Sequence, residues 1–544
     1  MKQFRISFLV VAFSLMLTGM AFALDIPNIS TWTQSMGVGG GGPGLGDLLI
    51  APFYDVRNLK NPDTPEGTTL LTTQDTLIGI VNTDEQYGCI ARVRFREWKR
   101  SREVLDFDIP LSCNDVWVGE VSRLTAGGGI INSPDRWISA TRTDDWFPST
   151  VFPTAGIPFK TDAMGSEGTA ADRLARTEYG YFEIIGEERV ACKMTTDGSW
   201  LRTGSVTVKG TTYPAPGTFE KDVKDTLMGN VYLIRPEAQI SHEYNMNAYS
   251  EFAVKNTGIW SLPLTGRPNL LQDVQGVSGT QVNPGVGGFD QLEAIMSKRY
   301  INFQYVDGID DATGTPTSTS VVITFPTKQF HYDTNFHHLI LANYPDWAPF
   351  TGYHETRDDG TAGGEVVKSY IYDRAENLLV PPEFPVSPGL GKLEILPWEV
   401  NVVGLLPVNS LPDPIARGWR DNLLLATQGA TGTAADTFKA GWVSLNLSPT
   451  STEVGSAIDT RADTTWGPVV AQGRSGISFS FFNNFFGAGA ALPAGQVQAG
   501  AGQYRGLPAV GIVMTEFYND TVKGYYGNTV PWQYEVDFGD APTL

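Results

Sequence analysis

A strict alternation of apolar and charged residues in one short segment restricts most strongly what this chain can fold into. In CIARVRFREW (residues 89–98), Ala91, Val93 and Phe95 alternate with arginines. Successive side chains of a β-strand point to opposite faces of a sheet, so this period of two predicts a strand with one apolar and one basic face. The next segment, residues 101–112, alternates in the same way with aspartates on its polar face. Together the two segments predict an antiparallel hairpin.

Short apolar or alternating runs bounded by turn residues recur along the rest of the chain. Glycine (59 residues) and proline (34) are frequent, and charged residues make up only 18%, which favours many short strands joined by turns. Two stretches, residues 245–254 and 289–300, have a helical pattern instead. We therefore expect a mainly β protein with two β-sandwich (Ig-like) domains, the first with an inserted stretch containing short helices.

The first residues predict export. Lys2 and Arg5 precede an apolar run at residues 8–17, and the small residues Ala21 and Ala23 form a signal-peptidase site. This run is too short for a transmembrane helix, and no later stretch is long and apolar enough to span a bilayer as a helix. The expected location is the cell surface or the extracellular space, with the periplasm as an alternative.

Four regions are expected along the chain. They are a signal peptide (residues 1–23), a Gly-rich flexible leader (24–47), an N-terminal β-sandwich-like domain with the helical insertion (48–335) and a C-terminal β-sandwich-like domain (336–544). The run Gly39–Gly42 is not a phosphate-binding loop, because it precedes an apolar strand and contains no lysine.

The chain is strongly acidic. Its net charge is −20, and removal of residues 1–23, which hold two basic and no acidic residues, makes it −22. Such a chain repels nucleic acid, and its surface carboxylates suit divalent cations. Weak calcium candidates are the aspartates of two turn regions, which solvated turns explain equally well: Asp307, Asp310, Asp311, Asp358 and Asp359. None has the spacing of an EF-hand, and no other cofactor is predicted.

The histidines do not form a metal motif. Three of the five in the chain, His331, His337 and His338, fall between residues 328 and 340, on what the pattern predicts to be an aromatic strand. They lack the fixed ligand spacing of zinc sites, so we expect structural or surface histidines. No catalytic residue can be identified, since the chain has neither a GxSxG elbow nor a recognisable Cys–His pair.

The basic hairpin supports two interpretations. Its cations form our interface candidates, a docking face for an acidic partner: Arg92, Arg94, Arg96, Lys99 and Arg100. Alternatively, the same cations form cross-strand pairs with Glu103, Asp106 and Asp108 on a solvated sheet face, an interpretation that we favour.

Two tryptophans in loops are the sugar-contact candidates. Trp146 lies in DDWFP and Trp347 in PDWAPF, where an exposed indole can stack on a sugar ring. Trp117, Trp398 and Trp442 lie in apolar strands, which predicts that they belong to the core.

An exported protein meets an oxidising compartment, so one disulfide and one free thiol are expected from the three cysteines. Cys89 and Cys113 flank the predicted hairpin and form the favoured pair. A pair that includes Cys192 is the alternative.

A series of segments resembles a family of exported, uncharacterised β-rich proteins of Gram-negative bacteria. The segments include IVNTD, VRFREWKRSREVLDFDIPLSCNDVW, GYFEIIGE, VVITFPTKQF, SYIYDRAE and LPWEVNVV, and they run in the same order from Gly46 to Glu535. The resemblance implies export and a β-rich fold, and it carries no activity, cofactor or catalytic residue.

These observations favour a non-catalytic exported protein of the cell surface, structural, surface-layer-like or partner-binding. Its partner is expected to be a second copy, a cell-surface protein or a glycan. The alternative is a carbohydrate-binding or carbohydrate-active exported protein.

Overall fold

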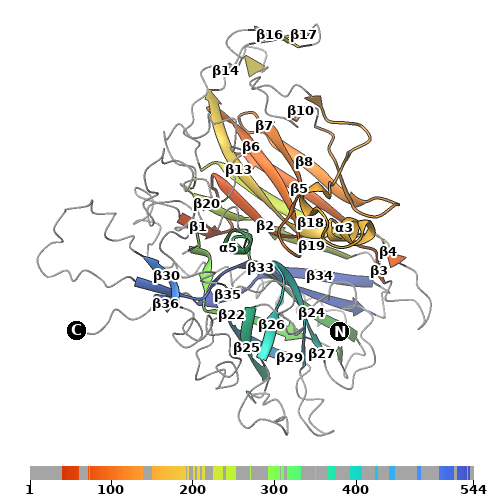
Figure 1. Ribbon diagram of the computed structural model, residues 1–544, viewed down its shortest axis with the longest axis vertical. Coiled ribbons are helices and arrows are strands. Elements are labelled where there is room, and N and C mark those ends of the chain that lie inside the picture. Colours follow the sequence, from red (N-terminus) through yellow and green to blue (C-terminus); the bar gives the residue numbers. More distant parts are fainter. Residues whose placement is uncertain are drawn as a thin grey trace, which may run out of the picture.

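The structure is a computed structural model, shown in Figure 1. It describes residues 39–60, 71–72, 74–135, 137–138, 150–191, 193–194, 200–201, 205–208, 211–214, 225–236, 240–250, 252, 270, 292–293, 295–306, 308–310, 315–332, 350, 365–374, 376, 393–406, 423–426, 440–447, 475–479, 502–519, 524–535 and 537–538.

Two six-stranded antiparallel sheets form the first sandwich, in the upper part of Figure 1. The basic sheet has the order β1 (Gly39–Gly42), β20 (Asn247–Ser250), β2 (Leu48–Asp55), β13 (Tyr179–Ala191), β6 (Tyr87–Glu97) and β7 (Glu103–Leu111). The outer sheet has the order β12 (Ile157–Pro158), β9 (Gly129–Asn132), β8 (Val116–Arg123), β5 (Asp75–Asn82), β18 (Leu227–Arg235) and β19 (Ile240–Asn245).

Two further sheets form the lower part of Figure 1. The central sheet has the order β28 (Leu423–Ala426), β27 (Val400–Leu406), β24 (Thr315–Thr324), β33 (Val510–Asn519) and β34 (Gly524–Pro531), and β23 (Gly308–Asp310) also pairs with β24. The aromatic sheet has the order β26 (Leu393–Leu396), β25 (Glu365–Asp373), β29 (Ala440–Asn446), β22 (Tyr300–Val306) and β35 (Gln533–Glu535). In these two sheets only the pair β27–β28, among the described strands, is parallel.

Small sheets and short helices complete the described elements. The small sheets are β3 (Leu59–Lys60) with β4 (Leu71–Thr72), β10 (Trp137–Ile138) with β11 (Thr150–Val151), β14 (Lys193–Met194) with β15 (Trp200–Leu201), β16 (Ser205–Val208) with β17 (Thr211–Pro214), β21 (Ser297–Lys298) with β32 (Leu507–Pro508), and β30 (Ser475–Phe479) with β31 (Gly502–Arg505) and β36 (Asp537–Phe538). The helices are the 3-10 helix η1 (Asp162–Met164), α3 (Ala170–Arg176) and α5 (Lys328–Tyr332). Within the described residues, none of the helices has the length and hydrophobicity to cross a membrane.

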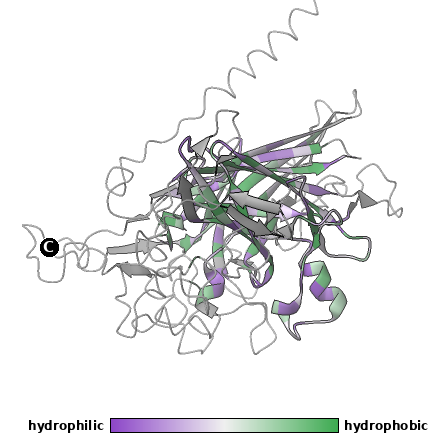
Figure 2. Ribbon diagram, turned by 90° about the horizontal axis from the view of Figure 1, so that it is seen from above, coloured by the Kyte–Doolittle hydropathy of each residue, from purple (hydrophilic) through white to green (hydrophobic). Residues whose placement is uncertain are grey.

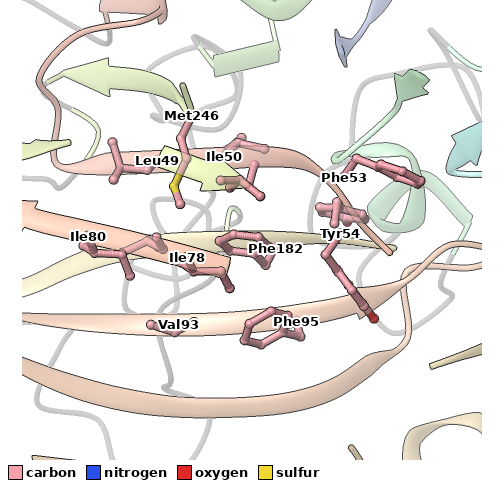
Figure 3. Close-up of a cluster of buried hydrophobic side chains, with 14 of the residues drawn as sticks. Leu49, Ile50, Phe53, Tyr54, Ile78, Ile80, Val93, Phe95, Phe182 and Met246 are labelled. Carbon is pink, nitrogen blue, oxygen red and sulfur yellow. The ribbon is translucent and has the colours of Figure 1, made fainter. Parts of the chain in front are cut away.

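Aromatic and branched side chains fill the core of the first sandwich. Figure 3 shows Phe95 and Phe182, from neighbouring strands of the basic sheet, pointing into the same cluster, and their ring centroids lie 5.0 Å apart. Phe95 also packs against Phe159, with centroids 5.0 Å apart. Because Phe95 is fully buried, its truncation to alanine is expected to cost about 3–5 kcal/mol.

The inner strands of the central sheet, β27, β24 and β33, are buried on both faces, so this sheet joins the first sandwich to the aromatic sheet. In β24, Val321 and Ile323 belong to the core shared with the aromatic sheet. Val322, between them, belongs to the core shared with the first sandwich. A strand covered on both faces reads as a continuous apolar run rather than as an alternation, which explains the sequence VVITF.

The predicted fold class, mainly β, is confirmed. Figure 2 shows hydrophobic and hydrophilic residues following one another along the strands, as a period of two requires. The sheets divide the chain earlier than expected, because β22 and β24 precede residue 335 and still pair with strands of the second half. Up to β20 the strands of the large sheets pair within the first half of the chain, and from β22 on they pair with strands of the second half.

Three local predictions were wrong or only partly right. Residues 247–250, predicted helical, form β20, while the second predicted helix is helical at residues 292–293 and 295–296 and then ends at β21. The expected flexible leader includes β1, which pairs with β20. Gly46, in the same segment, lies so close to the backbone of Tyr249 that a Cβ atom would approach its carbonyl oxygen to 2.2 Å.

Candidate functional site

An exposed pair of aromatic rings marks the outer face of the aromatic sheet. The rings of Tyr372 (β25) and Trp442 (β29) are stacked, with centroids 4.4 Å apart and planes at 8°. The side chain of Trp442 is 40% exposed, although Val443 beside it in the same strand is fully buried. The prediction that Trp442 belongs to the core was therefore wrong, whereas Trp117 is 2% exposed and does belong to it.

The strand register places polar residues in rows beside this pair. Trp442 lies opposite Tyr372 on one side and opposite Gln304 of β22 on the other. The next row, two residues along each strand, consists of Tyr370, Ser444 and Asn302, and the third of Lys368, Asn446 and Tyr300. Gln304 is exposed like Trp442, so the open end of this face is the row Tyr372–Trp442–Gln304.

The basic strand β6 has the opposite character, because its arginines are buried. Arg92 is 0% exposed and forms ion pairs with Asp106 and with Asp108, the latter at 2.5 Å between Nη1 and Oδ1. Arg94 Nε donates to Glu103 at 2.9 Å. These are the cross-strand pairs of the favoured interpretation, but the prediction that they lie on a solvated face was wrong, because all three arginines of β6 are buried. The arginines therefore do not form an exposed docking face.

Arg96 connects the basic sheet to the helix α5. Its Nε atom donates to Glu183 on β13 at 2.7 Å, and its Nη1 atom donates to the Gln329 side chain at 3.1 Å. Because burial opposes ionisation while Glu183 favours it, the balance raises the pKa of Arg96 above its ordinary value. Arg96 therefore acts as an internal cation that fixes α5 against the sheet.

A carboxylate that the sequence did not reveal, Glu97, organises the turn after β6. It accepts hydrogen bonds from the backbone N–H groups of Lys99 and Arg100, at 2.7 and 2.9 Å, and it pairs with Arg176 at 2.5 Å. Arg176 ends α3, whose first turn is fixed by a capping box between Thr169 and Asp172. The helix thus brings Arg176 to Glu97.

The two remaining interface candidates, Lys99 and Arg100, are half-buried at this turn. Lys99 Nζ lies 5.0 Å from the centroid of the Trp398 ring, and Arg100 Nη1 lies 3.4 Å from Glu167. Burial opposes ionisation of Glu167, but Arg176 and its neighbours outweigh it and lower the pKa of this carboxyl. Both candidates therefore have partners inside the molecule.

Glu399 lies at the junction between the first sandwich and the central sheet. It is fully buried beside Trp398, whose ring meets that of Trp98, in the turn after β6, edge-on with centroids 5.1 Å apart. Burial raises the pKa of Glu399 to about 8, and the positive charge of Lys328 opposes that shift. Lys328 Nζ lies 3.7 Å from the carboxylate of Glu365. The junction therefore holds a carboxyl group that titrates near neutral pH.

A second junction joins the edge of the outer sheet to the central sheet. His242 of β19 contacts Glu516 through Nε2 at 3.2 Å and Thr529 through Nδ1 at 3.0 Å. Glu516 also pairs with Arg235 of β18. All three charged or ionisable side chains are buried, so this cluster links β18 and β19 to β33 and β34.

Most of the calcium and sugar-contact candidates, and two of the histidines that were predicted to be structural, fall outside the described residues. This applies to Asp307, Asp311, Asp358 and Asp359, to His337 and His338, and to Trp146 and Trp347. Asp310 ends the strand β23. His331 lies in α5, so the predicted continuation of the strand through it was wrong. Across the described parts of the chain, no group of three or more metal-ligating side chains converges.

The predicted disulfide between Cys89 and Cys113 is wrong. Cys89 is a free thiol, buried at the start of β6, where its Sγ atom lies 3.5 Å from the carbonyl oxygen of Ile90. Burial raises the pKa of this thiol well above its ordinary value, and the nearby carboxylate of Glu187 adds to the effect. Cys192, the alternative partner, lies outside the described residues.

The aromatic face could have been found from the alternation alone. In KSYIYD the tyrosines alternate with Ile371, and in GWVSLN Trp442 alternates with Val443. The residues two and four positions after Trp442 are Ser444 and Asn446. Because both are polar, they indicate that this face of the strand points away from the core.

Comparison of the chain with family models, with curated proteins and with solved structures gave no match. The residues themselves therefore carry the functional argument.

Proposed function

We propose that this protein is an exported, non-catalytic component of the cell surface that acts by binding a partner through the exposed faces of its sheets. In this role it is a structural or surface-layer-like protein. The observation that carries the proposal is the exposure of large apolar side chains on the outward faces of strands. Trp442 is the clearest case, at 40% exposure on the aromatic sheet.

The outer sheet offers a second face of the same kind. Val116 and Val118 of β8 are 49% and 41% exposed, and Tyr232 of β18 is 37% exposed. Strand pairing places Val116 beside Val81, and it places Leu77 of the same strand β5 beside Tyr232. Contiguous apolar residues on a sheet surface are typical of interaction sites.

The use of the charged residues supports a non-catalytic role. Each arginine of β6 forms an ion pair with an acidic side chain of the same fold: Arg92, Arg94 and Arg96. Such pairs specify register and fix neighbouring elements, and truncation of one member leaves an uncompensated charge. The charges of the basic sheet thus serve the architecture.

Export is supported by the first 23 residues, with their basic start, apolar run and small-residue cleavage site. The strong negative charge suits a soluble exterior and, through surface carboxylates, divalent cations. Calcium is the one cofactor that we include in the proposal.

The proposal is tested by expressing the full chain in a Gram-negative host and sequencing the N-terminus of the mature protein. We expect the mature chain to begin at Leu24 and to be cleaved by protease added to intact cells. Recovery of the uncleaved chain in the cytoplasm would overturn the export part of the proposal.

Electron microscopy of the purified mature protein, with calcium and with chelator, tests the structural part. Sheets, filaments or rings support a surface-layer-like role, and their dependence on calcium supports a bound cation. Uniform monomers under both conditions would leave only the partner-binding role.

A further inference from the structure

We propose that the outer face of the aromatic sheet around Trp442 is a binding site for a neutral glycan chain. One pyranose ring stacks on the indole, and amide and hydroxyl side chains bind its hydroxyl groups. This inference rests on the proposed function and names the ligand class of one of its exposed faces.

The first argument is the orientation of the indole ring. Tyr372 covers one face of it, with nearly parallel planes 4.4 Å apart at their centroids. Tyr372 is on β25 and Gln304 is on β22, and the two strands flank β29 on opposite sides. The other face of the indole is therefore directed over β22, and the 40% exposure of Trp442 leaves room there.

The second argument is the set of polar groups beside that face. Gln304 is the direct neighbour of Trp442, and Asn302 and Ser444 lie in the next row. Directly opposite residues of antiparallel strands lie about 5 Å apart and diagonal ones about 7–8 Å apart. A ring stacked on the indole above β22 is thus within reach of two side-chain amides and one hydroxyl.

The third argument is the chemistry of the ligand that fits. A pyranose has an apolar C–H face, which suits an aromatic ring, and a rim of hydroxyl groups, which suits amides and hydroxyls. The side chains of the first two rows, from Tyr372 to Asn302, are all uncharged, so they suit an uncharged ligand. A nucleic-acid chain is disfavoured by the net charge of −20.

The open part of the face covers the first two rows, which lie about 6.7 Å apart along a strand. In the third row the central residue, Asn446, is 0% exposed, so the face is closed there. The face therefore accommodates a short segment of a glycan chain, with its stacked residue at the Trp442 end.

Titration calorimetry and tryptophan fluorescence on the mature protein test this site. The probes are cellohexaose, chitohexaose, maltohexaose and laminarihexaose, with polygalacturonate as an anionic comparison. At least one neutral hexasaccharide is expected to bind with a Kd of about 1 mM or lower. Trp442→Ala is expected to weaken that binding at least tenfold, and Gln304→Ala to weaken it severalfold.

The matched control is Tyr526→Ala, which removes an even more exposed aromatic side chain (54%, against 40% for Trp442) from β34 of the central sheet. It is expected to leave glycan binding unchanged, and all three variants are expected to retain the circular dichroism spectrum of the parent. Binding of none of the neutral probes, or equal loss in Trp442→Ala and Tyr526→Ala, would overturn the inference. So would preferential binding of polygalacturonate. These results are independent of the cleavage after Ala23 and of surface exposure, so failure of the glycan site is distinguishable from failure of the proposed function.

Discussion

The strands β6 and β29 have the same alternating pattern and the opposite arrangement in space. In β6 the charged face is buried, and Arg92 is 0% exposed; in β29 the face that carries an aromatic ring is open, and Trp442 is 40% exposed. Both strands direct their other face, Val93 in one and Val443 in the other, into a hydrophobic core. The alternation therefore determines that there are two faces, while the packing of further elements determines which of them meets water.

The physical reason for the difference lies in the partners of each face. The arginines of β6 can be buried because each has a carboxylate within ion-pairing distance, and because α5 closes over Arg96. The second face of β29 has no comparable charged partners in its first two rows. Its aromatic pair is stabilised by stacking instead, and such a pair contributes about 0.5–1.5 kcal/mol to the free energy of unfolding.

The largest expected effect is on the free energy of unfolding, when a buried arginine of β6 is removed. Arg92→Ala leaves Asp106 and Asp108 without their common cation, and loss of one member of a buried pair costs about 3–5 kcal/mol of the free energy of unfolding. Chemical denaturation measures this cost. Arg102→Ala is the control, because its side chain is 33% exposed and a surface pair is worth about 1 kcal/mol or less. Equal effects of the two substitutions would mean that the basic face is solvated.

A pH-dependent effect is expected at the junction. The pKa of Glu399 is raised by burial to about 8, so the folded state keeps a proton that the unfolded state releases above its ordinary pKa near 4.5. Stability therefore falls as pH rises between these values, by at most about 1.4 kcal/mol for each unit of the shift. Glu399→Gln removes this dependence, so the variant should match the parent near pH 4.5 and exceed its melting temperature at pH 8. An identical pH profile in both proteins would contradict the burial of this carboxyl.

A smaller loss of stability is expected from a substitution at the contact between the outer and central sheets. Gly527 of β34 lies against β19, where a Cβ atom would approach the carbonyl oxygen of Ser241 to 2.5 Å and His242 Cε1 to 2.9 Å. Gly527→Ala is therefore expected to cost about 1–3 kcal/mol. Gly79→Ala in β5 is the matched control, because its Cβ would have no neighbour within 4 Å. If both substitutions are equally mild, the two sheets are not in contact at this place.

The smallest expected effect is chemical rather than energetic. Cys89 is a buried free thiol with a raised pKa, so it should resist alkylation in the native protein and react after denaturation. Cys113 is then expected to pair with Cys192 in the exported protein, and non-reducing peptide mapping reveals that pair. Rapid alkylation of native Cys89, or a peptide that links Cys89 to Cys113, would contradict the structure.

The sequence predicted the fold better than the site. The period of two in β6 and β7 identified their hairpin and the acidic residues of β7 that pair with its arginines, because residues on one face of paired strands are neighbours. It could not show that these pairs are buried, since that depends on α5 and on other contacts distant in sequence. Asn247–Ser250 was misread because paired strands here override a weak helical pattern.

The site was missed for a related reason. Trp442 was assigned to the core because it stands among apolar residues, yet the alternation with Val443 and Leu445 places it on the other face. Hydrophobicity alone does not distinguish a buried indole from one that is kept exposed for binding. The stacking on Tyr372 and the exposed Gln304 beside it then show that this face is open.

Hydroxyl-radical footprinting with mass spectrometry tests the central claim most directly, because one experiment compares the two kinds of face in the same native protein. Trp442 is predicted to be oxidised many times faster than Trp117, whose side chain is 2% exposed, and a bound neutral oligosaccharide is predicted to slow the oxidation of Trp442 alone. Equal protection of Trp442 and Trp117 in the free protein would contradict an open aromatic face, and with it the proposed glycan site.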